Sequence, residues 1–268
     1  MSAKMKVGQL IRSLALLFYL LQAALVAPAQ SSPQLAVGAL RIRAWPSVDG
    51  RTRRLDRKRF FLVRGSLSAN RAWVEKTEQT PLLARDCYYR GVGASEALIR
   101  WLTKGDCDNV YCREVTAEDL EGAEAVPEFQ AAYQRGRREF GSAEVARQWL
   151  TVNLRDEIRN GFYKRQQELL RALVREAETV SHAPVQTAMT DRNGSAYFTD
   201  LEPGTYVVSN LLPTEVGGVA ILWNCEVEVK PKELSAAMKR PMQLNNAPNA
   251  PQKCFVERAL PACPARGV

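Results

Sequence analysis

The hydrophobic periodicity of this chain changes twice, and this feature limits the folds open to it more than any other. Residues 35–68 alternate between apolar and polar positions and are rich in β-branched and aromatic residues, which is typical of half-buried strands. From 69 to 183 the apolar residues recur at spacings of three and four, which indicates helices. After Pro184 the alternation returns and continues to about residue 230. We therefore predict an α+β fold in which a mostly α-helical insertion separates two halves of a β-structure.

Individual residues mark several boundaries inside the helical block. Ser95 is expected to cap a short helix that ends at Gly105, and Pro127 fits the first turn of the next helix. A long helical stretch is expected to begin at Ser142, with a bend or interruption at Gly161.

Two turns and three short strands follow one another between residues 187 and 208. Gly194 provides the positive φ of a tight hairpin, and a second turn contains Pro203 and Gly204. This string resembles the carboxypeptidase regulatory-like and transthyretin-like (prealbumin-like) β-sandwich family. The residues that carry the resemblance are Asn193, Gly194, Phe198, Leu201, Pro203, Gly204 and Tyr206.

The resemblance implies a small Greek-key β-sandwich built from residues 30–68 and 184–230. Residues 69–183 are then a helical insertion, and 231–268 an extended tail held by disulfides. Domains of this family serve as accessory modules in surface proteins and receptors, and the motif itself indicates a fold rather than an activity. The metallocarboxypeptidases in which such domains occur have a separate catalytic domain, and this chain contains no segment that matches one.

Residues 1–29 have the features of a secretory signal peptide. A basic start is followed by an uncharged stretch from Leu14 to Val26 and by the small residues of Ala27-Pro28-Ala29. The alternative is an uncleaved anchor, for which the 17 uncharged residues from Ser13 to Ala29 are barely long enough. We expect cleavage before Gln30, export to the periplasm or the outside of the cell, and no stable membrane span in the mature protein.

Export determines how the six cysteines are interpreted. In an oxidising compartment three disulfides are expected in preference to free thiols. A zinc site at the first closely spaced pair is the alternative, but the sequence lacks a second paired-cysteine motif. Spacing favours two local bridges and leaves one long-range pair: Cys107 with Cys112, Cys254 with Cys263, and Cys87 with Cys225.

The strongest charge feature is the segment from Arg41 to Arg64, which holds nine basic residues against two acidic ones. Such a segment attracts anionic polysaccharide, lipid headgroups or nucleic acid, although a solvated loop between two strands also accounts for it. Nucleic acid is not expected as a partner, because the protein is exported and no aromatic ladder interleaves the basic residues. The predicted anionic-ligand surface consists of Arg51, Arg53, Arg54, Arg57, Lys58 and Arg59.

No catalytic residue, metal ligand or cofactor is predicted. The single histidine, His182, excludes schemes that need two imidazoles, and no serine lies in a nucleophile elbow. The segment from Asp191 to Gly194 resembles the start of a calcium loop, but a hairpin turn accounts for the same residues.

Seven aromatic residues form a possible platform for stacking sugars, although packing in the core accounts for most of them. They are Trp73, Tyr88, Tyr89, Trp101, Tyr111, Trp149 and Trp223. The sequence as a whole predicts an exported, non-catalytic binding module of the bacterial cell envelope with an envelope protein or polysaccharide as its partner. A carbohydrate-binding module is the alternative, and an enzyme with its site in the helical insertion is a remote one.

Overall fold

The computed structural model describes residues 37–48, 50–231, 239–246 and 254–263, so the expected signal peptide lies outside the described residues. The strands of the chain are β1 (Gly38–Ala44), β2 (Ser47–Val48), β3 (Arg51–Thr52), β4 (Arg59–Arg64), β5 (Gln186–Met189), β6 (Ser195–Leu201), β7 (Gly204–Ser209), β8 (Thr214–Val216), β9 (Val219–Val229), β10 (Met242–Leu244) and β11 (Phe255–Ala259). The helices are α2 (Arg71–Gln79), α3 (Arg85–Gly91), α4 (Glu96–Lys104), α5 (Pro127–Phe140), α6 (Ala143–Gln148) and α7 (Phe162–Ser181), with a 3₁₀ turn at Thr151–Asn153 and a π-helical turn at Glu157–Gly161.

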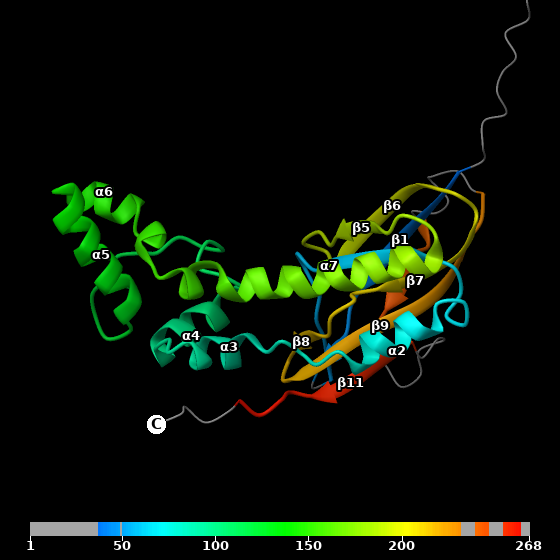
Figure 1. Ribbon diagram of the computed structural model, residues 1–268, viewed down its shortest axis with the longest axis horizontal. Coiled ribbons are helices and arrows are strands. Elements are labelled where there is room, and N and C mark those ends of the chain that lie inside the picture. The colour runs from blue at the N-terminus through cyan, green and yellow to red at the C-terminus, as the bar shows by residue number, and fades with distance from the viewer. Residues whose placement is uncertain (1–36, 49, 232–238, 247–253, 264–268) are drawn as a thin grey trace, which may run out of the picture. The chain divides into compact units, whose positions relative to one another are not determined.

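Two sheets form a β-sandwich, as predicted (Figure 1). The smaller sheet has the order β10-β1-β6, and the larger has the order β11-β9-β7-β4-β5 with β8 paired to β9. Strand β4 lies between β5 and β7, with Leu62 opposite Gln186 on one side and Val208 on the other. Each sheet therefore combines strands from the two halves of the sandwich, which are far apart in sequence.

The sandwich core lies between the two sheets because β1 alternates strictly. Leu40 and Ile42 point inward, where they join Phe60 and the fully buried Trp223 in one apolar cluster. The rings of Phe60 and Trp223 lie 5.9 Å apart. Burial of such large side chains is the main favourable contribution to folding of this part of the chain.

The hairpin motif is built by local hydrogen bonds. Gly194 has a φ of 70°, and the Asp191 carboxylate accepts hydrogen bonds from the backbone amides of Asn193 and Ser195 at 2.8 and 2.9 Å. These bonds occupy the carboxylate oxygen in a turn, which agrees with the hairpin interpretation. Further along, the hydroxyl of Tyr206 donates to the carbonyl oxygen of Glu202 at 2.8 Å and fixes the turn that contains Pro203 and Gly204.

The helices between α3 and the π-helical turn have a core of their own, which includes Tyr89, Trp101 and Phe129. The residues that begin and end α4 in this core are the ones predicted from the sequence. Ser95 caps α4, accepting a hydrogen bond from the amide of Leu98, and Gly105 ends the helix. The side chain of Glu128 also binds Ser95 through both the amide and the hydroxyl, which fixes the start of α4 against α5.

Helix α7 contributes to the helical core and to a third apolar cluster on the outside of the sandwich. Phe162 at its start belongs to the helical core, whereas Leu170, Leu173 and Ala177 pack against the outer face of the larger sheet. Trp73 of α2 completes this third cluster, and its indole donates to the carbonyl oxygen of Leu173 at 3.2 Å. Figure 1 shows α2 and the second half of α7 lying over the sandwich.

Three local predictions need correction. The helix expected from Ser142 is broken into α6, the 3₁₀ turn, the π-helical turn and α7, so Gly161 is one of several interruptions. The last part of the alternation, which ends near residue 230, predicts two strands at 219–223 and 225–229, but these residues form the single strand β9. The tail also contributes β10 and β11 to the sheets, because each finds an unpaired edge, on β1 and β9 respectively.

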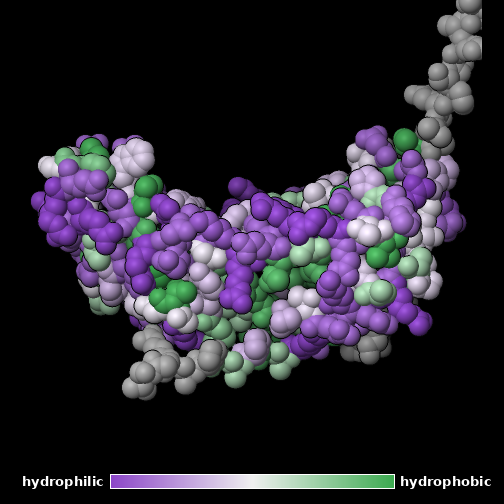
Figure 2. All heavy atoms as spheres, viewed as in Figure 1, coloured by the Kyte–Doolittle hydropathy of each residue, from purple (hydrophilic) through white to green (hydrophobic). Residues whose placement is uncertain are grey.

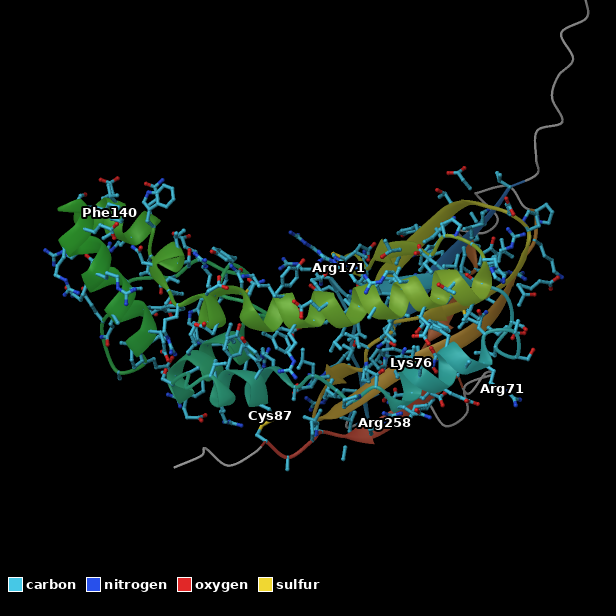
Figure 3. All side chains as sticks on the ribbon, in the orientation of Figure 1. Arg71, Lys76, Cys87, Phe140, Arg171 and Arg258 are labelled. Carbon is cyan, nitrogen blue, oxygen red and sulfur yellow. A yellow bond between two sulfur atoms is a disulfide. The ribbon has the colours of Figure 1, made fainter. Side chains whose placement is uncertain are left out.

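Three disulfides are present, but only one of the three favoured pairings is right. Cys107 is bonded to Cys112, as expected from their spacing. The other two pairings were wrong: the pairs formed are Cys225 with Cys254 and Cys87 with Cys263. The reason is the pairing of β11 with β9, which places Cys254 beside Cys225. The tail then continues from β11 to α3, where Cys263 reaches Cys87, labelled in Figure 3.

Candidate functional site

The segment 51–59, here called the basic loop, is held to the sandwich by its backbone and by one buried side chain. Leu55 is buried in the sandwich core, and its amide donates to the carbonyl oxygen of Ala44 at 3.1 Å. Thr190, itself buried, accepts hydrogen bonds from the amides of Arg57 and Lys58 at 3.0 and 2.9 Å. The cationic side chains therefore extend from a backbone that is fixed at several points.

The basic loop forms one wall of a cleft of about 570 Å³. The first half of α7 forms a second wall, and the segment 210–218 around β8 forms a third. Two segments of the helical block, 82–85 and 103–108, complete the lining. The cleft thus brings together five stretches of chain that are far apart in the sequence.

Five of the six predicted anion-binding residues line this cleft. Arg53, Arg54 and Arg57 are exposed at the surface, whereas Lys58 and Arg59 are half-buried. Arg51 lies in the short β2-β3 hairpin and does not line the cleft.

A sixth cation of the cleft, Arg85, comes from the helical block, and its side chain is held by three neighbouring residues. Its guanidinium donates to the hydroxyl of Thr103 at 2.9 Å and to the carbonyl oxygen of Cys107 at 3.3 Å, and pairs with Asp86 at 3.0 Å. These bonds direct the side chain of Arg85 toward the short disulfide loop that begins at Cys107.

Three carboxylates face the cations. Lys58 pairs with Asp106 at 3.4 Å, so this ion pair joins the basic loop to the helical block across the cleft. Burial raises the pKa of the neighbouring Asp108 carboxyl, and the charge of Asp106 raises that pKa further, whereas Lys58 and Arg85 lower it. The net effect is a carboxyl group whose pKa lies above its usual value.

Glu215, from β8, is the third carboxylate. Its pKa is also raised, because the concave surroundings disfavour the charged form even though the residue as a whole is exposed. The charge of Arg85 lowers this pKa, and the charges of Asp86 and Asp106 raise it. Neutralisation of Asp108 and Glu215 therefore requires a smaller fall in pH than neutralisation of an ordinary surface carboxylate.

The cleft combines a cationic majority with an apolar floor. Six cationic side chains face three carboxylates, and the amides of Gln166 and Gln167 from α7 add neutral hydrogen-bonding groups. Phe61, Leu170 and Leu212 supply apolar surface. Figure 2 shows apolar side chains bordered by hydrophilic ones in the middle of this face. Such a lining is suited to an anionic ligand that also presents hydroxyl groups and some apolar surface.

Metal binding and imidazole catalysis gain no support from this geometry. Within the described ranges, no three His, Cys, Asp or Glu side chains are placed to hold a metal ion. His182 caps the end of α7 with a φ of 51°, is exposed, and does not line the cleft.

The seven aromatic residues considered as a sugar platform do not form one. Trp73, Tyr89, Trp101 and Trp223 are buried in the three cores, where they cannot stack on a ligand. Trp149 and Tyr111 are about half exposed, at 48% and 50%, but neither lines the cleft.

Sequence reasoning missed the acidic wall of the cleft and Arg85. Asp106 and Asp108 flank Cys107, and a local disulfide loop carrying two acids was a signal that could have drawn attention to them. No comparable signal marks Glu215, which reaches the cleft only through the pairing of β8 with β9.

Comparisons with known proteins leave the family unassigned. No family model matches the chain, and no curated protein matches it, so the resemblance carried by residues 187–208 stays a prediction. A structure of the pilus backbone RrgB from Streptococcus pneumoniae matches with 13% identity and a TM-score of 0.25, covering 78% of this chain and 40% of that one. A structure of the full-length major pilin RrgB from the same organism has 13% identity and a TM-score of 0.24, with coverage of 78% and 30%. The chain spans less than half the length of these pilins, and TM-scores of this size carry no argument, so the fold assignment rests on the sheet topology alone.

Proposed function

We propose that this chain is an exported, non-catalytic binding module of the bacterial cell envelope that holds an anionic ligand in the basic-loop cleft. The observation that carries the proposal is the convergence of Arg53, Arg54, Arg57, Lys58 and Arg59 on one cleft. A solvated loop would leave such residues dispersed, whereas here their backbone is fixed and a sixth cation faces them.

Export is supported by the disulfides and by the sequence of residues 1–29. Three disulfides are typical of a protein that folds in an oxidising compartment. In the part of the chain that the structure describes, no helix has the length and apolar character that crossing a bilayer requires. The division at 30–68, 69–183 and 184–230 also remains a proposal, with the qualification that α2 and half of α7 pack on the sandwich.

Binding of an acidic polysaccharide by residues 30–268 tests the proposal. Polygalacturonate is the probe and neutral dextran the control polymer, each titrated by calorimetry at low and high salt. The double variant Arg53→Gln, Arg57→Gln removes two exposed cations of the cleft, and Arg137→Gln, Arg138→Gln removes two from α5 as a matched control.

We expect only the cleft variant to lose affinity for polygalacturonate. An exposed ion pair contributes at most about 1 kcal/mol, a factor of about five, so the cleft double variant is expected to bind more weakly by up to about 25-fold. The α5 variant should bind like the wild type, and dextran should not bind. Equal weakening by both variants would mean that net charge alone attracts the polymer, and the cleft would not be the site.

A second candidate function, glycoside hydrolysis, is favoured by the three carboxylates. The pKa of Asp108 is raised, as general-acid catalysis requires, and Asp106 lines the same cleft, so these two residues would fill the roles of the acid and the second carboxylate. Prolonged incubation of the polymer with the protein, followed by chromatography of the products, distinguishes the two functions. Release of shorter chains by the wild type but not by Asp108→Asn would replace the binding module with an enzyme.

A further inference from the structure

The outer face of the three-stranded sheet carries two arginines from one strand. Arg41 and Arg43 are the outward-pointing residues of β1, on the side opposite the core. In the register of the sheet Arg41 lies opposite Tyr197, and Arg43 lies between Ser195 of β6 and Gln243 of β10. Tyr197 is 45% exposed, so this face is open to solvent there.

Aromatic rings hold the guanidinium groups on this face in place. The guanidinium carbon of Arg41 lies 5.5 Å from the ring centre of Tyr197, and that of Arg43 lies 4.5 Å from the ring centre of Trp45. Arg54 of the basic loop lies over the same indole at 5.5 Å. We call Arg41, Arg43 and Arg54 the guanidinium row.

Further hydrogen bonds fix the scaffold of the row. The indole nitrogen of Trp45 donates to the carbonyl oxygen of Asn193 at 2.8 Å, which fixes the ring that two arginines share. Arg41 donates to the hydroxyl of Ser195 at 3.2 Å. The Nε of Arg43 is buried with no hydrogen-bond partner. A guanidinium held in place by stacking loses less rotamer freedom when a ligand binds to it.

The guanidinium row is continuous with the cleft. Arg54 belongs to both, because it stacks on Trp45 and also lines the cleft beside Arg53 and Arg57. Two residues of a strand span about 6.7 Å, so Arg41 and Arg43 present cations at a regular interval along β1. A path of cations therefore leads from the sheet face over the basic loop into the cleft.

We propose that the ligand is a linear acidic polysaccharide whose chain runs along this path and occupies the guanidinium row and the cleft together. The inference deepens the proposed function and rests on it. A polysaccharide fits better than a protein partner, because the row offers guanidinium, hydroxyl and amide groups and lacks the apolar centre of a protein interface. A single-stranded nucleic acid stacks its bases on free aromatic rings, whereas two arginines lie over the ring of Trp45 and one lies over that of Tyr197.

Dependence of binding on oligomer length tests this inference. Digalacturonate is short enough for the cleft alone, and decagalacturonate is long enough to cover both surfaces. The row variant is Arg41→Gln, Arg43→Gln; the cleft variant is Arg53→Gln, Arg57→Gln; and Arg137→Gln, Arg138→Gln is the matched control. Circular dichroism and the thermal midpoint check that each variant is folded.

The wild type should bind the decamer at least tenfold more tightly than the dimer, because both surfaces engage one chain. The row variant should bind the decamer no more tightly than the dimer, and its affinity for the dimer should equal that of the wild type. The cleft variant should bind both the dimer and the decamer more weakly. Should the row variant be unstable, Arg43→Lys keeps the charge without the planar fork and is expected to lose part of the same gain.

Other outcomes separate this inference from the proposed function. If the dimer binds at the cleft but the row variant binds the decamer like the wild type, the inference is wrong and the cleft remains a site. If neither oligomer binds to the wild type, both are wrong. If polyglutamate shows the length dependence and polygalacturonate does not, the ligand is an acidic protein segment and the polysaccharide assignment is overturned.

Discussion

Removal of the Cys87–Cys263 disulfide should be the most costly of the three disulfide deletions. The bond closes a sequence separation of 176 residues, against 29 for Cys225–Cys254 and 5 for Cys107–Cys112. In the chain-entropy description, the restriction of the unfolded chain grows with the logarithm of loop length. At 25 °C this gives stabilisations of about 5, 3.6 and 2 kcal/mol for the long, intermediate and short loops.

The long disulfide also connects elements with different cores. Cys263 follows β11 of the larger sheet after three residues, and Cys87 lies in α3, which packs in the helical core. Its removal therefore frees the tail from the helical block in the native state as well. We expect the unfolding transition of this variant to broaden, because the helical core and the sandwich then unfold less cooperatively.

The assay is urea unfolding of residues 30–268 followed by far-ultraviolet circular dichroism. Each disulfide is removed by a pair of Cys→Ala substitutions, so that no free thiol remains to exchange with the other bonds. The variant without Cys107–Cys112 is the control, because it also loses a disulfide of the helical block but one that closes only a short loop. If the control lost as much unfolding free energy as the Cys87–Cys263 variant, the loop-length argument would be refuted.

Three further predictions follow from local features. Protonation of Asp108, whose pKa is raised, removes a negative charge from the cleft, so dextran sulfate should bind more tightly as the pH falls and this carboxyl is protonated, and the calorimetric pH profile of Asp108→Asn should be flatter; an identical profile would contradict this role. Gly161→Ala would place a Cβ on the hydroxyl of Tyr88 and should lower the free energy of unfolding by about 1–3 kcal/mol in urea titrations, whereas an unchanged value would mean that the π-helical turn can shift. Ser95→Ala removes the cap of α4 and the hydroxyl that donates to Glu128, and should cost about 1 kcal/mol; Ser95→Thr keeps a hydroxyl and should recover most of this stability, whereas Ser95→Asp should not, because its carboxylate would lie against that of Glu128, and full recovery by the aspartate variant would contradict a role for the Glu128 contact.

Features fixed by neighbouring residues could be predicted from the sequence. The cap at Ser95, the stop at Gly105 and the hairpin at Gly194 each depend on a few consecutive residues, so the pattern alone places them. The division into two strand-rich halves around a helical block can also be predicted, because the spacing of apolar residues over a long stretch of sequence distinguishes helices from strands.

Features fixed by distant contacts could not be predicted in the same way. The pairing of Cys225 with Cys254 depends on β11 joining β9, and a strand of five residues in a proline-rich tail gives little signal of its partner. In the candidate site, the basic loop was visible as a charge run, whereas Asp108 and Glu215 come from separate segments that only tertiary packing brings together.

The helical block connects two neighbouring strands of the larger sheet, and this has a consequence for how such a chain could arise and be engineered. Strands β4 and β5 are antiparallel neighbours, so residues 65–185 occupy the place of an ordinary hairpin connection. Loop-closure entropy grows so slowly that this connection costs only about 3 kcal/mol more than a four-residue turn, before the packing of its own core is counted. The segment between α2 and the second half of α7 is accordingly a transplantable unit. A sandwich that keeps those two helices to cover Phe61 and Val63 should tolerate its replacement by a short linker, or by a different helical domain, provided that Cys263 is substituted as well, because its partner Cys87 leaves with the segment and the stabilisation from that disulfide is lost.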